Sequence, residues 1–147
     1  FNKEDVLKNL TGNNKNLMSQ VINRGKDKNS IELDTINKKC SSILPNRFIL
    51  IKGDACITSL EFKKKNLGAR IKLLYLDMDL EEPTFQVLNN LWDRVVINGL
   101  VVLDEYGFHK WDESNGVDRF LKTIKGKYKL LNTNVQNPTM IIEKIDF

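Results

Sequence analysis

Two short apolar runs, each closed by acidic residues and separated by one amphipathic segment, restrict the fold of this 147-residue chain most strongly. The runs are RIKLLYLD, which ends at Asp77, and GLVVLDEYG, which contains Asp104 and Glu105. Continuous apolar strands joined through a helix are typical of a parallel sheet covered by helices. The order therefore predicts an α/β fold with a mostly parallel sheet and helices on both faces. The segment between the runs has one apolar helical face, formed by Phe85, Leu88, Leu91, Trp92, Val95 and Val96.

Turn-forming residues predict where the remaining elements begin and end. Pro83 suits the first turn of the central helix, and Asn98-Gly99 suits its C-terminal end. Upstream, IELDTINKKCSSIL predicts a helix that Pro45 ends, and RFILIKGDA predicts a strand. Downstream, YKLLNTNV and TMIIEKI are separated by Asn137-Pro138 and predict an antiparallel C-terminal hairpin.

The length of the chain suits a single domain over residues 1–147. Within it we expect a polar helical region over 1–46 and the sheet-bearing core over 47–147. The chain begins with Phe1 rather than Met, and we expect it to be a fragment or a trimmed product. No apolar run reaches the roughly 20 residues that span a bilayer, so we expect no membrane partner. Cys40 and Cys56 lack the spacing of a metal site and predict free thiols in a reducing, cytoplasmic setting.

Basic residues are concentrated in the first half of the chain. Residues 1–72 carry 15 Lys and Arg against 7 Asp and Glu, whereas the whole chain has a net charge of only +4. Apart from Lys63-Lys64-Lys65 these charges are scattered, and no aromatic stacking motif lies among them. A solvated lysine-rich surface explains this pattern. We therefore expect no nucleic-acid partner.

The acids at the strand ends predict a site. Ligands of open parallel sheets bind beyond the carboxyl ends of the strands, where Asp77 and Asp104-Glu105 would emerge side by side. Clustered carboxylates repel one another unless a cation or a proton joins them, and Mg²⁺ accepts such oxygen ligands. A bound Mg²⁺ lowers the pKa of a coordinated hydroxyl. The alternative is structural, because Asp79, Glu81 and Glu82 also suit the start of the following helix.

Three candidate site residues, each with an aromatic ring, follow the second strand. His109, the sole histidine, is a candidate general base near neutral pH, or else an ordinary surface residue. Tyr106 and Trp111 could form an apolar wall for a flat or sugar-like ligand, or could pack on the sheet. The sequence does not decide between the functional and the structural role for any of these three residues.

Three stretches together carry a resemblance to a known family. They are KGDA, KLLYLDMDLEEPTFQVLNNLWDRVVINGLVVLDEYG and NGVDRFL. From about Arg47 to Leu121 the chain resembles the C-terminal part of the macrocin O-methyltransferase family, metal-dependent enzymes of the Rossmann-like S-adenosylmethionine class. The resemblance implies methyl transfer from S-adenosylmethionine to a hydroxyl of a small-molecule acceptor, such as a sugar or natural product. Positioning and electrostatics would supply much of the rate.

The resemblance also implies roles for particular residues. Asp77, Asp104 and Glu105 correspond to a magnesium site, and Asp77 and Asp79 to catalytic positions, with Asp79 as a further ligand or a base. Gly53, Asp54 and Ala55 correspond to the segment beside the cofactor's adenine.

The chain departs from the family pattern at three places. Glu105 stands where the family usually has a second aspartate, and Glu81 where it has a tyrosine. No GxG occurs anywhere, although such enzymes hold the cofactor with a Gly-rich loop after their first strand. We therefore expect the first two strands of the full fold to be missing from this chain.

Two other functions stay open on the sequence. The chain could be a non-catalytic Rossmann-like module that has lost its cofactor site, with an open sheet edge that favours a homo-oligomer. The Asp-x-Asp of YLDMDL also occurs in metal-dependent glycosyltransferases, but the nearby Asp104-Glu105 strand counts against that class.

Overall fold

The chain forms two compact units, Phe1–Gly53 and Asp54–Phe147. A computed structural model describes residues 15–16, 19–20, 32–107 and 112–146. The single domain predicted over 1–147 stays a prediction, and each unit is taken by itself below. Among the described residues, no helix combines the length and apolar character needed to cross a bilayer.

The first unit contains helix α3, Leu33–Ile43, which confirms the helix predicted before Pro45. The strand predicted over RFILIKGDA is wrong, because residues 48–52 form neither strand nor helix. A strand needs a hydrogen-bonded neighbour, and the described part of this unit contains no other strand to pair with. Ile49 is accordingly 80% exposed. Apolar composition alone did not decide the conformation of this run.

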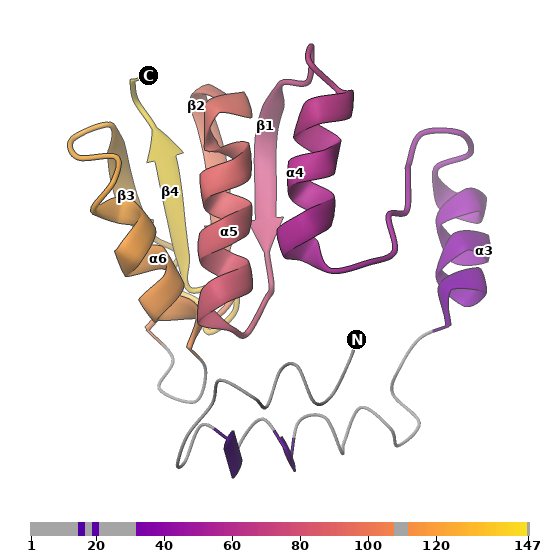
Figure 1. The fold of residues 1–147 in the computed structure, drawn as a ribbon, viewed down its shortest axis with the longest axis horizontal. Coiled ribbons are helices and arrows are strands. Elements are labelled where there is room, and N and C mark those ends of the chain that lie inside the picture. Colours follow the sequence, from indigo (N-terminus) through magenta and orange to yellow (C-terminus); the bar gives the residue numbers. More distant parts are fainter. Residues whose placement is uncertain (1–14, 17–18, 21–31, 108–111, 147) are drawn as a thin grey trace. The chain divides into compact units, whose positions relative to one another are not determined.

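The second unit alternates helices and strands in an α/β order (Figure 1). Its helices are α4 (Ala55–Lys65), α5 (Glu81–Leu91), the short 3₁₀ helix η1 (Trp92–Arg94) and α6 (Glu113–Leu121). Its strands are β1 (Ile71–Leu76), β2 (Val95–Leu103), β3 (Tyr128–Asn132) and β4 (Met140–Lys144). The strand order in the sheet is β1-β2-β4-β3.

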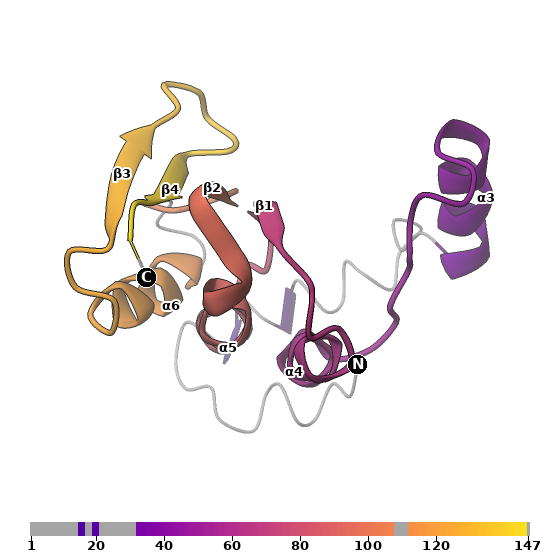
Figure 2. The ribbon, with the colours of Figure 1, turned by 90° about the horizontal axis from the view of Figure 1, so that it is seen from above.

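The sheet contains one parallel pair, β1 with β2, and two antiparallel pairs that involve β4. The α/β class, the parallel pairing of β1 with β2 and the antiparallel C-terminal hairpin are confirmed. Figure 2 shows α4, α5 and α6 on one face of this sheet. Among the described residues of the second unit, no helix covers the opposite face.

The boundary between α5 and β2 differs from the predicted one. Pro83 lies in the first turn of α5, as predicted, but the helix ends at Leu91. Val95 and Val96 begin β2 instead of continuing the helix, since β-branched side chains suit a pleated surface at least as well. Asn98, with φ of +59°, lies in β2 where its register against β1 shifts, so Asn98-Gly99 marks an irregularity in the strand rather than a helix end.

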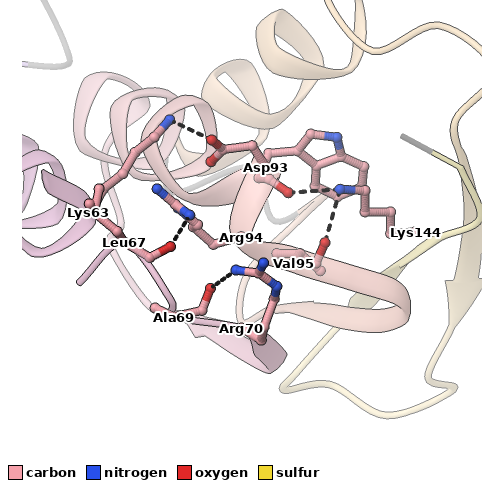
Figure 3. A network of polar contacts seen from close by, with 9 residues as sticks. Lys63, Leu67, Ala69, Arg70, Asp93, Arg94, Val95 and Lys144 are labelled. Carbon is pink, nitrogen blue, oxygen red and sulfur yellow. Dashed lines mark hydrogen bonds and ion pairs between the residues drawn. The ribbon is translucent and has the colours of Figure 1, made fainter.

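The core lies between the sheet and the three helices. Alternate residues of the strands, such as Leu76, Val101 and Ile142, face Leu88 of α5 and Phe120 of α6, and all five are essentially fully buried. At the other end of the sheet from the acidic strand ends, Lys144 Nζ donates to the carbonyl oxygens of Trp92 at 3.1 Å and Val95 at 2.9 Å (Figure 3). Apolar packing therefore holds the helices on the sheet. At one end of the sheet, the buried Lys144 also joins β4 to η1 and to the start of β2.

Candidate functional site

The two acidic strand ends lie side by side. Leu76 and Leu103, the last residues of β1 and β2, are partners in the parallel register. The N–H of Asp104 donates to the carbonyl oxygen of Leu76 at 3.0 Å. Asp77 and Asp104 therefore leave the sheet from neighbouring positions at its carboxyl edge, which is the juxtaposition that the sequence predicted.

The charges of this cluster act on one another. Partial burial raises the pKa of the Asp77 carboxyl above its ordinary value, and the nearby charges of Asp104 and Asp79 raise it further. Asp79 has φ of +59°, a left-handed conformation that Asp tolerates better than most residues. Its carbonyl oxygen accepts the N–H of Asp112 at 3.0 Å. The edge is thus a region of negative potential in which Asp79 is held by its backbone.

Both carboxylate oxygens of Asp104 accept hydrogen bonds. Oδ1 accepts the hydroxyl of Tyr75 on β1, and Oδ2 accepts the amide of Asn137, from the loop between β3 and β4, at 2.9 Å. The hydrogen bond to Asp104 is the main cause that raises the pKa of Tyr75 to about 12, so this hydroxyl stays protonated near neutral pH. Asp104 therefore joins the end of β2, where it lies, to β1 and to the loop between β3 and β4.

A fourth acid, which the sequence analysis did not single out, lies behind these strand ends. Glu113, the first residue of α6, is fully buried. Its Oε1 accepts the N–H of Glu105 at 3.3 Å, and its Oε2 accepts the N–H of Met78 at 3.5 Å. Burial raises the pKa of this carboxyl, and the charges of Asp104 and Asp77 act in the same direction. Glu113 thus belongs electrostatically to the same cluster.

The residues predicted beside a cofactor lie at the start of α4. Asp54 is the N-cap of this helix, and its Oδ1 accepts the N–H of Cys56 at 2.8 Å. Ala55 is the first helical residue, and Gly53 precedes the cap. The carboxylate therefore has a structural task in the chain, while its cofactor role stays a prediction.

Of the other candidates, His109 and Trp111 lie outside the described residues. The hydroxyl of Tyr106 donates to Asp118 Oδ1 at 2.8 Å, and its ring packs against the core, which favours the structural alternative. Glu81 and Glu82 lie in the first turn of α5, where Arg119 Nη1 approaches them at 3.6 and 2.8 Å. Their placement fits the predicted helix-start role.

The acids do not form a metal centre as they are arranged. Within residues 32–107 and 112–146, no three His, Cys, Asp or Glu side chains come together in a group that could hold a metal ion. Asp104 is turned toward Tyr75 and Asn137. The donor chemistry suits Mg²⁺, but this arrangement does not assemble a ligand set for it.

The sequence contained a signal for Tyr75 but only a weak one for Glu113. Alternation along KLLYLD places Tyr75 on the face opposite Leu74 and Leu76, two positions before Asp77. Glu is rarely buried, and nothing in DESNG distinguishes Glu113 from an exposed helix-start acid. At Asn137 the sequence pattern indicates only a turn.

A model of the Macrocin-O-methyltransferase (TylF) family matches residues 61–136, more than half of the chain. The chain belongs to the macrocin O-methyltransferase family. The matched segment includes β1, α5, β2 and α6, and so contains both acidic strand ends and Glu113. The resemblance inferred from the sequence is confirmed. A search of curated proteins gives no match.

Solved structures of methyltransferases share the fold. The calicheamicin methyltransferase CalS11 aligns with a TM-score of 0.58 at 21% identity, over 91% of this chain and 48% of that one. The O-methyltransferase NovP aligns with a TM-score of 0.66 at 14% identity, over 88% and 51% of the two chains. A putative rRNA methylase from Clostridium thermocellum aligns with a TM-score of 0.53 at 21% identity, over 79% of this chain and 73% of that one.

This chain of the macrocin O-methyltransferase family spans about half the length of CalS11 and NovP. At these identities the similarity concerns the fold. Within that fold the matched segment provides a carboxyl edge with clustered acids, and the capped start of α4 lies just before it in the chain.

Proposed function

We propose that the protein containing this chain is an S-adenosylmethionine-dependent O-methyltransferase that acts on a hydroxyl of a small molecule, a sugar or natural product. The observation that carries the proposal is the match of the macrocin O-methyltransferase family to residues 61–136, the segment that bears both acidic strand ends. One structural neighbour is described as a TDP-rhamnose 3'-O-methyltransferase, which supports a sugar hydroxyl as the acceptor class. Family membership also disfavours the glycosyltransferase alternative.

In this proposal the carboxyl edge of the sheet receives the acceptor. Asp79 is the candidate base, because its backbone is held by Asp112 and its side chain is partly exposed. Asp77 lies beside it with a raised pKa. Gly53, Asp54 and Ala55, at the start of α4, are the candidates for contact with the cofactor. His109 stays a candidate proton acceptor on the sequence argument alone.

The test is transfer of a labelled methyl group from S-adenosylmethionine to a panel of nucleotide-linked deoxysugars. We expect transfer by the protein that contains this chain, and a fall in kcat of roughly 100-fold or more for Asp79→Asn, the usual contribution of a general base. Glu82→Gln, a change at an exposed acid of α5, is the matched control and should keep the activity. Absence of both S-adenosylmethionine binding and methyl transfer would falsify the proposal.

Magnesium dependence is a second part of the proposal. It is supported by the mutual effect of Asp77, Asp79 and Asp104, since clustered negative charge favours a cation. It requires that Asp104 exchange its hydrogen bond with Asn137 or Tyr75 for the ion. Calorimetric titration with Mg²⁺ should show binding to the wild type that Asp104→Ala weakens at least tenfold, the ordinary effect of a lost ligand or its neighbour. An unchanged affinity would remove Asp104 from the site.

A non-catalytic Rossmann-like module is the second candidate. It is favoured by the lack of a Gly-rich loop in the sequence and by the lack of a ligand group among the described acids. It predicts no heat of binding with S-adenosylmethionine and a homo-oligomer in light scattering. For either function we propose a cytoplasmic protein with no nucleic-acid or membrane partner, in keeping with the free thiols of Cys40 and Cys56.

A further inference from the structure

Glu113 is placed between the two segments that carry the clustered acids. It is the first residue of α6 and is fully buried. One oxygen accepts the N–H of Met78, which lies between Asp77 and Asp79, and the other accepts the N–H of Glu105. A single carboxylate thus bridges the turn after β1 and the end of β2.

The rest of the first turn of α6 reinforces this bridge. The N–H of Asp112 donates to the carbonyl oxygen of Asp79 at 3.0 Å. The hydroxyl oxygen of Ser114 accepts the N–H of Gly107 at 2.8 Å. The N-cap Asp112 and the first two residues of α6, Glu113 and Ser114, therefore contact the backbone of the segments that follow β1 and β2. No comparable bridge from α4 or α5 is found among the described residues.

Stability alone does not explain a glutamate at this position. A buried carboxylate is costly unless it is paired, and among the described residues Glu113 accepts from backbone N–H groups rather than from Lys or Arg. An apolar side chain of similar size would pack on the core without the cost of burying a charge. What the carboxylate adds is two acceptors that point in two directions.

We propose that Glu113 is a positioning residue that fixes the segment of Asp77 and Asp79 relative to that of Asp104 and Glu105. Its consequence for catalysis rests on the proposed methyltransferase function. Fixing these segments holds the candidate base and its neighbouring acids in one geometry, as a preorganised site requires.

Amide hydrogen exchange measured by NMR on the 147-residue chain tests the positioning without any activity. In Glu113→Gln one oxygen is replaced by an NH₂ group, which cannot accept from a backbone N–H. We expect exchange at Met78 or Glu105 to become at least roughly tenfold faster, as for loss of a hydrogen bond to a charged group. Val117→Ala, a buried change on the same helix, is the control, and it should speed exchange in the core without selecting these two amides.

Glu113→Met is the second variant, in case the glutamine variant folds poorly. Its side chain fills a similar volume without a buried charge, so it should fold and should speed exchange at both amides. If exchange at Met78 and Glu105 is unchanged in the variants that fold, the positioning role is overturned, whatever the activity.

Steady-state kinetics tests the catalytic consequence. Glu113→Gln should lower kcat roughly 10- to 100-fold, as misplacement of a catalytic group does, while KM for S-adenosylmethionine changes little. Val117→Ala should leave kcat within about twofold after allowance for the folded fraction. An unchanged kcat with faster exchange overturns the catalytic consequence, while the faster exchange itself supports the positioning role. If the wild type itself transfers no methyl group, the proposed function fails, and the exchange result still decides the positioning role.

Discussion

The carboxylate of Asp54 caps α4 and at the same time acts on the thiol of Cys56 two residues later. Burial is the largest cause that raises the pKa of Cys56 to about 11, and the hydrogen bond and charge of Asp54 follow. Tyr75 shows the same coupling at the acidic edge, where its pKa rises to about 12 beside Asp104. At the residue scale, each of these two acids therefore helps to raise the pKa of a neighbouring side chain.

This coupling predicts a slow thiol. At pH 8 a pKa of about 11 leaves roughly one Cys56 thiol in a thousand as thiolate, the reactive form. In a Cys40→Ser background, iodoacetamide should modify the chain slowly, and Asp54→Asn should speed the reaction several-fold, since Asn caps the helix equally well without the charge. Equal rates for the two proteins would show that burial alone protects the thiol.

At the element scale, α6 carries much of the architecture of the site. Gly116 lies where this helix meets α5, and a Cβ there would be 2.3 Å from the carbonyl oxygen of Glu81 and 2.9 Å from Thr84 Cβ. Close approach of the two helices therefore depends on the missing side chain. Arg119 adds a surface contact by lying over the Phe85 ring at 3.8 Å.

Gly116→Ala is accordingly expected to destabilise the chain. Overpacking of this kind costs about 1–3 kcal/mol, because backbone must shift to admit the methyl group. Asn115→Ala, an exposed change on the same helix, should stay within about 0.5 kcal/mol of the wild type. Urea unfolding monitored by circular dichroism measures both, and equal midpoints for the two variants would contradict the close packing.

Lys144 on β4 is a second element-scale test. Lys144→Met leaves the carbonyl oxygens of Trp92 and Val95 without this donor, and loss of a partner to a buried polar group costs about 1–3 kcal/mol. Lys122→Met, at an exposed lysine after α6, controls for the change in net charge. Urea unfolding at pH 7 should show a clearly lower midpoint for Lys144→Met only.

The same lysine predicts a pH dependence of stability. Burial is the main cause that lowers the pKa of Lys144 below its ordinary 10.5. Between the folded-state pKa and 10.5 the unfolded chain binds more protons, so this group makes the free energy of unfolding rise with pH in that window. Compared with Lys144→Met, the wild type should gain stability from pH 7 toward pH 10. A difference in the free energy of unfolding between the two proteins that stays constant with pH would show that the pKa of Lys144 is not lowered.

At the scale of the whole molecule, the packed core belongs to the second unit. Its buried cluster extends from Leu76 to Ile142, with Ala55 and Phe62 of α4 packed against it. The division of the chain after Gly53 thus separates α3 from a sheet that has its own core. All residues of this buried cluster lie within the second unit.

We therefore expect residues 54–147 to fold when they are produced alone. Amide resonances of Val101 and Ile142 in the isolated segment should coincide with those in the full chain, because a core keeps its shifts when its neighbours are unchanged. The remaining part of the chain, residues 1–53 produced alone, is the control. Loss of amide dispersion in 54–147 would show that its core depends on the first 53 residues.

Much of this architecture was readable from local patterns. Apolar runs closed by acids predicted β1, the end of β2 and the side-by-side placement of Asp77 and Asp104, because side-chain periodicity and the edge rule of parallel sheets are local in origin. Proline and asparagine likewise marked the end of α3 and the hairpin of β3 and β4. Such signals need no knowledge of distant residues.

Tertiary structure decided the rest, since those outcomes depend on partners far away in the chain. Val95 and Val96 pair as a strand although their spacing fits a helix, and residues 48–52 form no strand because no partner strand is present among the described residues of their unit. Glu113 reaches Met78 across 35 positions. Burial and hydrogen bonding of a carboxylate are set by what surrounds it in space, and a linear pattern does not contain that information.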